Sequence, residues 1–184
     1  KGLVAIDSKI ELDDQAYFRH SKLYQDLKEE IRLISGDVPG TRSAEDTITY
    51  VPLSGNIGLV SDGAGTGLLT LDLLAKYGGQ VANFCELGGI TSPEVVYKAL
   101  HKVHQDPNVK SVLVVLIGGF NRMDEMAEGI VNFYQESSSK IPLFIRMCGT
   151  KEEEGKKLMQ NAKIAIDDNL HEAVKKAVKK AMES

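Results

Sequence analysis

Two glycine-rich segments carry the residues of this chain whose types could do chemistry. The first, Ser61–Gly65, follows the short apolar run Ile57–Val60 and precedes leucines at helical spacing. The second, Gly118–Asn121, follows Ser111–Ile117, the most apolar run of the chain, and precedes another helical pattern. A small-residue loop between a buried strand and a helix places free backbone N–H groups at the positive end of the helix dipole. Both segments therefore favour the binding of an anion, such as a nucleotide phosphate, without any charged side chain.

Neither segment carries a motif that identifies a ligand by itself. The GxGxxG fingerprint of dinucleotide-binding folds and the Lys-Ser/Thr pair of a P-loop are both missing. Close helix–strand packing explains the small residues of the first segment equally well. Gly118 and Gly119 are more informative, because they stand directly before a helix. Arg122 near that helix start could reinforce an anion site or could simply be exposed.

No set of residues suited to nucleophilic or acid–base catalysis can be assembled from the sequence. The histidines are expected at surface positions in or beside helical patterns: His20, His101, His104 and His171. An anion site without a nucleophile or a base implies that the chemistry is completed elsewhere.

The two cysteines, Cys85 and Cys148, both lie in apolar, strand-like runs. Such positions predict buried, reduced thiols and favour a cytosolic compartment. Two isolated cysteines are also too few for a metal site.

The composition is that of a soluble globular protein. Of the 184 residues, 42% are hydrophobic and 26% are charged. No apolar run approaches the ~20 residues that span a bilayer, and no signal peptide opens the chain. The net charge of −4 does not favour a nucleic-acid partner. We therefore expect no membrane and no nucleic acid among the partners, and a location in the cytoplasm, or in the mitochondrial matrix if the source is eukaryotic.

From about residue 47 onward, strand and helix patterns alternate regularly. They predict an α/β fold with a doubly wound, parallel, five-stranded sheet of flavodoxin-like order 2-1-3-4-5 and helices on both faces. The five strands are predicted at residues 57–60, 81–87, 111–117, 142–148 and 163–166. A further short strand at 48–53 contains Pro52, which argues for an edge position. Ligands of such sheets bind beyond the carboxyl ends of the strands, where the winding reverses between strands one and three. The two glycine-rich segments fall at that point.

Residues 1–46 have a different pattern from residues 47–184. Leu3–Leu12 has the pattern of a strand, and a helix is predicted near Gln15–Ile34. A lone strand and a helix cannot bury a core of their own. We therefore expect this segment to be the remnant of a domain whose other strands lie upstream of Lys1.

Four segments of the chain together resemble a known family. GNIGLVSDGAG, NFCELGGITSPEVVYKAL, SVLVVLIGGFNRMDEMAEGI and PLFIRMCGTKEEEGKKLM are similar, in order and spacing, to the C-terminal ligase-CoA domain of succinyl-CoA synthetase β subunits. The amino-terminal LVAIDSKIELDDQAYFRH resembles the end of the ATP-grasp domain that precedes it in those subunits. The resemblance implies a ligase-CoA domain at 47–184 and an ATP-grasp remnant at 1–46.

The resemblance also implies an activity that is divided between two subunits. The family joins a carboxylate to CoA with ATP or GTP and Mg²⁺, and the histidine that carries the phosphoryl group belongs to an α partner, which also binds most of the CoA. Helix N-termini from both subunits stabilise that phosphohistidine. The chain alone is therefore expected to be inactive, and no catalytic residue is assigned to it.

The resemblance further assigns roles to individual residues. Gly119, Phe120 and Asn121 match the family's substrate- and phosphate-facing loop, and Gly118 with Gly119 would stabilise the phosphate. Asp62 matches the substrate-binding asparagine of the first loop. The resemblance also matches one residue to a magnesium-ligating aspartate of the ATP-grasp domain: Asp7.

Five positions depart from the family pattern. Asp62 replaces an asparagine and would repel a carboxylate or phosphate unless it is protonated or paired with a cation. Glu86 replaces an aspartate, Ile90 a glycine, Val115 an asparagine and Cys148 a glutamate. These changes leave the identity of the carboxylate substrate open.

The alternative to an enzyme domain is a non-catalytic binding or assembly module that keeps the fold and docks an α-like partner. A flavodoxin-type FMN binder is disfavoured, because the chain has no tryptophan and the first loop lacks a hydroxyl-rich phosphate pattern.

Overall fold

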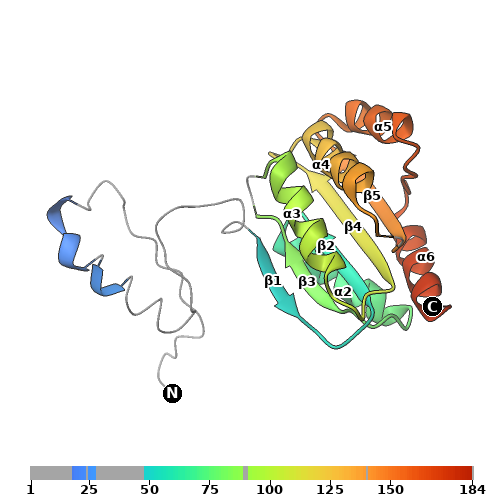
Figure 1. Cartoon of the computed structure of the whole chain (residues 1–184), viewed down its shortest axis with the longest axis horizontal. Coiled ribbons are helices and arrows are strands. Elements are labelled where there is room, and N and C mark those ends of the chain that lie inside the picture. The colour runs from blue at the N-terminus through green and yellow to red at the C-terminus, as the bar shows by residue number, and fades with distance from the viewer. Residues whose placement is uncertain (1–17, 24, 28–47, 89–90, 140, 184) are drawn as a thin grey trace, which may run out of the picture. The chain divides into compact units, whose positions relative to one another are not determined.

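The computed structural model describes residues 18–23, 25–27, 48–88, 91–139 and 141–183. The chain divides into two units, 1–42 and 43–184. In the first unit, residues 21–23 and 25–27 are helical, within the helix predicted near Gln15–Ile34. The predicted strand Leu3–Leu12 lies outside the described residues. The second unit carries the α/β fold (Figure 1).

A five-stranded, mostly parallel sheet forms the centre of the second unit (Figure 1). Its order is β1-β3-β2-β4-β5, with β1 antiparallel to β3 and the other neighbours parallel. The strands are β1 (Thr49–Pro52), β2 (Ile57–Ser61), β3 (Asn83–Glu86), β4 (Ser111–Gly118) and β5 (Leu143–Gly149). The α/β class is therefore confirmed, as are the neighbours of the first four predicted parallel strands. The short strand with Pro52 lies at an edge, as its proline predicts.

The predicted fifth parallel strand, 163–166, is wrong. Lys163 has a left-handed backbone with φ 60°, and the Ile164 amide donates back to the Met159 carbonyl at 2.9 Å. This segment therefore serves to end the preceding helix. A single described hydrogen bond, from Asp167 N to Ile145 O at 2.7 Å, ties the following residues to β5. The fifth strand of the sheet is instead β1, at the opposite edge.

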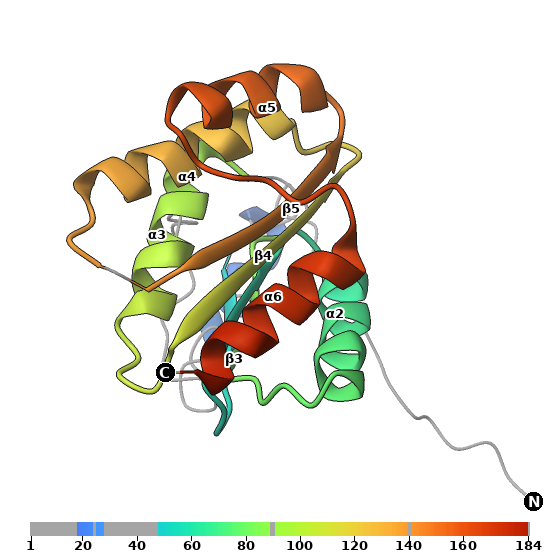
Figure 2. The ribbon, with the colours of Figure 1, turned by 90° about the vertical axis from the view of Figure 1, so that its right-hand side faces the viewer.

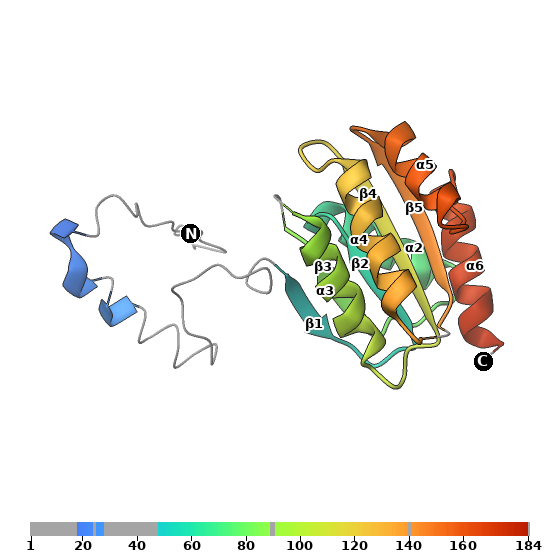
Figure 3. The same ribbon diagram turned by 45° about the horizontal axis from the view of Figure 1, so that its top comes forward.

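Five helices cover the two faces of the sheet: α2 (Ala64–Lys76), α3 (Pro93–His104), α4 (Met123–Glu136), α5 (Glu152–Asn161) and α6 (Leu170–Met182). α2 and α6 cover one face and α3 and α4 the other (Figure 2). α3 and α4 lie side by side, and α5 packs next to α4 (Figure 3). The chain thus forms three layers around two apolar cores, as the alternation of strands and helices predicts.

The central strand β4 contributes to both cores, because successive side chains of a strand point to opposite faces. Val112, Val114 and Leu116 pack on the α3–α4 side. Leu113 and Val115 pack on the α2–α6 side. All five side chains are fully buried, which confirms the central position predicted for the most apolar run.

Helix α3 begins where the sequence predicts. The Ser92 hydroxyl accepts a hydrogen bond from Val95 N at 3.4 Å, and Pro93 occupies the first helical position. A serine cap and a proline at this position both favour helix initiation. None of the described helices is long and apolar enough to cross a membrane.

Candidate functional site

The predicted site residues of the second unit gather at the carboxyl edge of the sheet. Asp62 directly follows β2, and Gly118 is the last residue of β4. The register pairs Ser61 with Val115 and Gly118 with Gly149, so the loops after β2, β4 and β5 are neighbours. The predicted metal ligand, Asp7, lies outside the described residues. Among those residues, no group of three or more His, Cys, Asp or Glu side chains could hold a metal ion.

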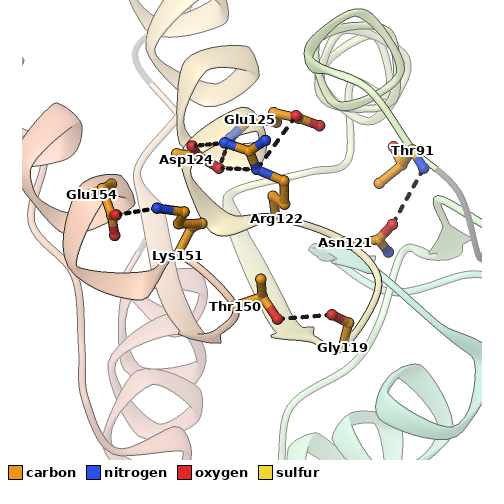
Figure 4. Close-up of polar contacts among 9 residues, drawn as sticks. All are labelled: Thr91, Gly119, Asn121, Arg122, Asp124, Glu125, Thr150, Lys151 and Glu154. Atoms are coloured by element: carbon orange, nitrogen blue, oxygen red, sulfur yellow. Dashed lines mark hydrogen bonds and ion pairs between the residues drawn. The ribbon is translucent and has the colours of Figure 1, made fainter.

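Thr150, in the loop after β5, ties together the segment between β4 and α4. Its amide donates to Gly118 O at 3.2 Å, and its hydroxyl donates to Gly119 O at 2.8 Å (Figure 4). Its carbonyl accepts from Met123 N at 2.8 Å. One residue therefore binds both ends of the Gly118–Asn121 segment and fixes its course.

Phe120 and Asn121, predicted to face the substrate, have different environments. The Asn121 Oδ1 atom accepts a hydrogen bond from Thr91 N at 3.3 Å and so links this segment to the loop before α3 (Figure 4). The Phe120 side chain is 97% exposed. Asn121 therefore contributes to the fold of the site, whereas Phe120 is open to a ligand or to another protein.

The backbone amides of this segment are open donors. No described residue accepts a hydrogen bond from the N–H groups of Gly119, Phe120, Asn121 or Arg122. The carbonyl oxygens of Gly118 and Gly119, in contrast, are engaged by Thr150. A turn with bonded carbonyls and unbonded amides has the polarity that an anion requires.

Two acidic residues, Asp124 and Glu125, already lie in the first turn of α4. Arg122 forms a two-point contact with Asp124, at 2.6 and 3.1 Å, and a longer one with Glu125, at 3.6 Å (Figure 4). The Arg122 hydrogen bonds lower the pKa of Asp124 below its ordinary value. Arg122 thus serves its own helix, and anion binding would depend on the loop amides more than on this side chain or on the helix dipole.

Asp62 is buried, with only 6% of its surface exposed. Its Oδ2 atom accepts a hydrogen bond from Ile117 N at 2.7 Å, one residue before Gly118. Burial raises the pKa of Asp62, while the Ile117 hydrogen bond and the charge of Arg146 act in the opposite direction. The Asp62 side chain therefore anchors the end of β4 by a hydrogen bond, directly before the Gly118–Asn121 loop begins.

Several buried polar atoms at this edge of the sheet have no hydrogen-bond partner. They are Asp62 Oδ1, Thr91 Oγ1, Arg146 Nε and Arg146 Nη1. No other buried side-chain polar atom of the described residues lacks a partner. Because buried polar groups are normally satisfied, these unpartnered atoms make the carboxyl edge of the sheet the candidate site of the described residues.

The glycines of the site fall into two groups. A Cβ on Gly118 would lie 2.4 Å from Asn121 O. Gly149 has a φ of 116°, and a Cβ there would lie 2.2 Å from Gly118 O. The fold itself requires these two. A Cβ on Gly63, Gly65 or Gly119 would meet no atom within 4 Å. The fold itself therefore does not require glycine at these three positions.

Several apolar side chains of helix α2 and of the segment that ends β4 are exposed. Helix α2 exposes 57% of Leu68 and 52% of Leu69, although its leucine pattern predicts a packed helix. Ile117 and Phe120 are also exposed. An apolar group of this kind beside a polar site is typical of a protein–protein contact.

The histidines of the second unit lie on helices α3 and α6, whereas Cys148 pairs in register with Ile117 at the site. His20, His101 and His171 are exposed as predicted, but His104 is not a surface residue. Its ring packs against Phe133 with centroids 4.6 Å apart, because α3 and α4 lie together. Of the two cysteines, Cys85 is buried and Cys148 half-buried, and both are free thiols.

Sequence reasoning missed two residues that organise the site, Thr150 and Arg146. Thr150 lies two residues beyond Cys148 and follows a strand that pairs with β4 in register, so alignment of the two strand ends could have found it. For Arg146 the signal was a charge inside an otherwise apolar strand.

Comparison with known proteins identifies relatives over nearly the whole chain. The sequence model of the CoA-ligase family matches residues 60–180. The β subunit of an ADP-forming succinate–CoA ligase from Roseiflexus is 41% identical over 181 residues, which cover 97% of this chain and 46% of that protein. A GDP-forming β subunit from Thermus thermophilus is 40% identical, over 96% of this chain and 46% of its own length. A protein from Mesorhizobium japonicum described as a probable malate–CoA ligase β subunit is 38% identical, over 96% and 44%. The chain thus spans about half the length of the curated relatives it matches.

Solved structures share the fold at low sequence identity. ATP citrate lyase from Methanothrix soehngenii, in complex with citrate and coenzyme A, superposes with a TM-score of 0.64 and 19% identity, over 91% of this chain and 49% of that chain. An acetyl-coenzyme A synthetase from Korarchaeum cryptofilum superposes with a TM-score of 0.59 and 18% identity, over 86% and 41%.

Proposed function

Because the chain belongs to the CoA-ligase family, we propose that it is the carboxyl-terminal domain of a β-like subunit of an NDP-forming acyl-CoA synthetase. In this acid–thiol ligase, a carboxylate is joined to CoA at the expense of ATP or GTP. The domain supplies the loop that faces the substrate carboxylate and the transferred phosphate. In this proposal residues 47–184 are the ligase-CoA domain, and residues 1–46 are the end of an ATP-grasp domain.

The observation that carries this proposal is the polarity of the Gly118–Asn121 segment. Thr150 takes up its carbonyl groups, while the amides from Gly119 to Arg122 have no described acceptor. Phosphate and carboxylate oxygens are the natural acceptors for such amides. Gly119 leaves the backbone open to close approach.

The site has anion-binding groups but no histidine among its described residues. This supports a division of labour in which a histidine of an α-like partner carries the phosphoryl group. The exposed apolar side chains of Leu68, Leu69, Ile117 and Phe120 are suited to dock that partner. Docking here would bring the partner's histidine to the open amides and exclude water from the transfer step.

For the substrates we propose only a chemical class. The relatives carry the names of succinate–CoA and malate–CoA ligases, so a small di- or hydroxycarboxylate is proposed here. We further propose ATP or GTP with Mg²⁺, with Asp7 as one metal ligand, and CoA bound mainly by the partner. A cytoplasmic location stays a prediction from composition.

Phosphate titration followed by NMR tests this proposal on the chain itself. Inorganic phosphate should shift the amide resonances of Gly119 to Arg122 at low salt. Gly119→Pro removes one of these donors and should abolish the response if the amide is used. Responses confined to other amides would place the anion site elsewhere and contradict the proposal. Sulfate serves as a second probe, because its geometry is similar and its charge does not change near neutral pH.

A ligase assay separates the enzyme from the assembly-module alternative. The chain alone should form no acyl-CoA from succinate or malate with CoA and ATP. Addition of an α-like subunit and the nucleotide-binding region should restore acyl-CoA formation. Stable docking of the α-like subunit with no activity in the complete assembly would favour the non-catalytic module.

A further inference from the structure

Arg146 is a charged residue inside an otherwise apolar strand. Its neighbours Ile145 and Met147 are buried against the α3–α4 core. Arg146 points to the opposite face of the sheet, where the register places it beside Val115 of β4. Its Nε and Nη1 atoms are buried and have no described hydrogen-bond partner. Arg146 is half-buried as a whole, but buried guanidinium nitrogens without a partner are costly, and a nearby negative charge offsets that cost.

Asp62 is positioned to provide that charge. Ser61 pairs with Val115, and Val115 pairs with Arg146, so Asp62 and Arg146 lie on either side of the same strand near its end. Asp62 Oδ1 is buried and also lacks a described partner. Burial raises the pKa of Asp62, while the amides of Ile117 and Asp62, the Thr66 hydroxyl and, last, the charge of Arg146 lower it. The two groups form no direct ion pair, and a bridging water molecule would satisfy the open atoms of both.

A second carboxylate, Glu152, also feels the charge of Arg146. Glu152, at the start of α5, accepts a hydrogen bond from Gly149 N at 3.0 Å. The Lys156 hydrogen bond, the Gly149 amide and, more weakly, the charge of Arg146 lower the pKa of Glu152. Asp62 holds the amide of Ile117 and Glu152 holds that of Gly149, so both carboxylates fix a strand end beside the Gly118–Asn121 segment.

We propose that Arg146 and Asp62 form a charge pair without direct contact, in which Arg146 is a positioning residue that acts through Asp62 on Ile117 N and so on the Gly118–Asn121 loop. The pair also neutralises the negative charge of Asp62 beside the open amides. Its relevance to phosphate rests on the proposed function, whereas the pair itself concerns only this chain. Position 62 thus carries an acid without repelling an anion, because the compensating cation lies within the same strand layer.

The titration of the Asp62 carboxyl tests the pair without any ligand. The full 184-residue chain is labelled with ¹³C at aspartate side chains, and the Asp62 signal is assigned by its loss in Asp62→Asn. Arg146→Met should raise the titration midpoint by roughly one pH unit, the lower range for loss of a neighbouring opposite charge. Arg146→Lys keeps the charge and should restore most of the wild-type midpoint. The Ile117 amide should follow the same midpoint, because Asp62 accepts its hydrogen bond.

Two charge-matched controls separate the pair from a general change in net charge. Lys157→Met removes an exposed cation from α5, and Asp72→Asn removes an exposed acid from α2. Neither should move the Asp62 midpoint. An Asp62 midpoint that is the same in Arg146→Met and in the wild type would overturn the inference. If Arg146→Met does not fold, Arg146→Gln keeps polar atoms without the charge, and the same readout decides.

Relocation of the carboxylate is a second test. Cys148 lies two residues beyond Arg146 on the same face of β5, so a longer acidic side chain there can reach the guanidinium. Asp62→Asn removes the negative charge near Arg146 and should lower the free energy of unfolding in urea. The double variant Asp62→Asn with Cys148→Glu should recover part of that stability. Cys148→Glu that destabilises Asp62→Asn further would count against a compensating role for the acid.

Phosphate titration of the Arg146→Met variant distinguishes failure of this inference from failure of the proposed function. If both hold, Arg146→Met weakens the phosphate response of Gly119 to Arg122 several-fold. If Arg146→Met shifts the Asp62 midpoint but phosphate does not shift the wild-type amides, the charge pair is supported and the phosphate site is contradicted. If phosphate shifts the amides but Arg146→Met leaves the Asp62 midpoint unchanged, the phosphate site is supported and the charge pair is contradicted.

Discussion

The hydroxyl of Thr150 donates a hydrogen bond to the carbonyl oxygen of Gly119 at 2.8 Å and so fixes the open loop after β4 to the loop after β5 (Figure 4). The same residue binds Gly118 and Met123 through its backbone. The orientation of the candidate anion donors is therefore set by a residue of the neighbouring strand unit, not by the loop's own sequence.

Thr150→Val should loosen the loop with a small loss of global stability. The change keeps the shape of the side chain and removes one partly solvated hydrogen bond, worth about 0.5–1.5 kcal/mol at most. We expect a weaker phosphate response of the Gly119 to Arg122 amides in NMR titration. Thr49→Val in the edge strand β1 is the control and should leave that response unchanged. Equal responses in both variants would contradict the role of Thr150.

Gly118→Ala and Gly119→Ala form a matched pair with opposite expectations. A methyl group on Gly118 meets the backbone oxygen of Asn121 and should cost about 1–3 kcal/mol in urea unfolding, as overpacking typically does. The methyl group on Gly119 meets open space and should leave stability within about 0.5 kcal/mol. Gly119→Ala should nevertheless weaken phosphate binding. Loss of stability in Gly119→Ala, with binding intact, would refute this assignment.

His104 should make the free energy of unfolding depend on pH between neutrality and mild acid. Burial against α4 lowers the pKa of His104 below 6.5, with a smaller contribution from the charge of His101. The unfolded chain therefore binds a proton at a higher pH than the native state, and stability falls as the pH drops from above 6.5 through the lowered value. Urea unfolding at about pH 7.5 and about pH 5.5, on either side of the ordinary histidine pKa, should show a larger loss for the wild type than for His104→Gln.

The control for this pH dependence is His20→Gln, since His20 is exposed in the first unit. It should lose as much stability on acidification as the wild type does. A wild-type curve that is flat over this range, or one that His104→Gln leaves unchanged, would show that the ring does not remain neutral in the fold.

Leu68→Ser and Leu69→Ser should weaken association with an α-like subunit without loss of stability. Both side chains are more than half exposed, so their removal affects a contact surface rather than the core. Leu74→Ser, on the buried side of the same helix, should instead unfold the chain at lower urea concentration. Size-exclusion chromatography and calorimetry with the α-like subunit distinguish the two effects. Unchanged affinity in both surface variants would place the partner elsewhere.

Local patterns were sufficient to predict most of this fold. The apolar run Ser111–Ile117 forms a buried central strand, and Ser92-Pro93 forms a helix start, because each signal acts over a few residues. The strand predicted at 163–166 was wrong, because a short apolar stretch can form the end of a helix as readily as a strand. The types of those four residues do not indicate whether their amides will bond to the preceding helix or to a neighbouring strand.

The location of the candidate site could be predicted from the sequence, but the hydrogen bonds that connect its residues could not. The position of the Gly118–Asn121 loop follows from sheet topology. The contacts of Thr150 with Gly119 and of Asp62 with Ile117 join residues 31 and 55 positions apart, and they depend on strand register. The roles of Asp62, Gly119, Phe120 and Asn121 toward a ligand stay predictions.

Arg146 has one further consequence, which concerns the outer edge of the sheet. β5 is the last strand on its side, and the described chain beyond it contributes a single backbone hydrogen bond to it, at Ile145. A strand from a second molecule could extend the sheet on this side along β5, and on the other side along β1. A charged side chain within an edge strand disfavours such pairing, and Arg146 is the charged residue of β5. Arg146 thus also works against edge-to-edge association along β5.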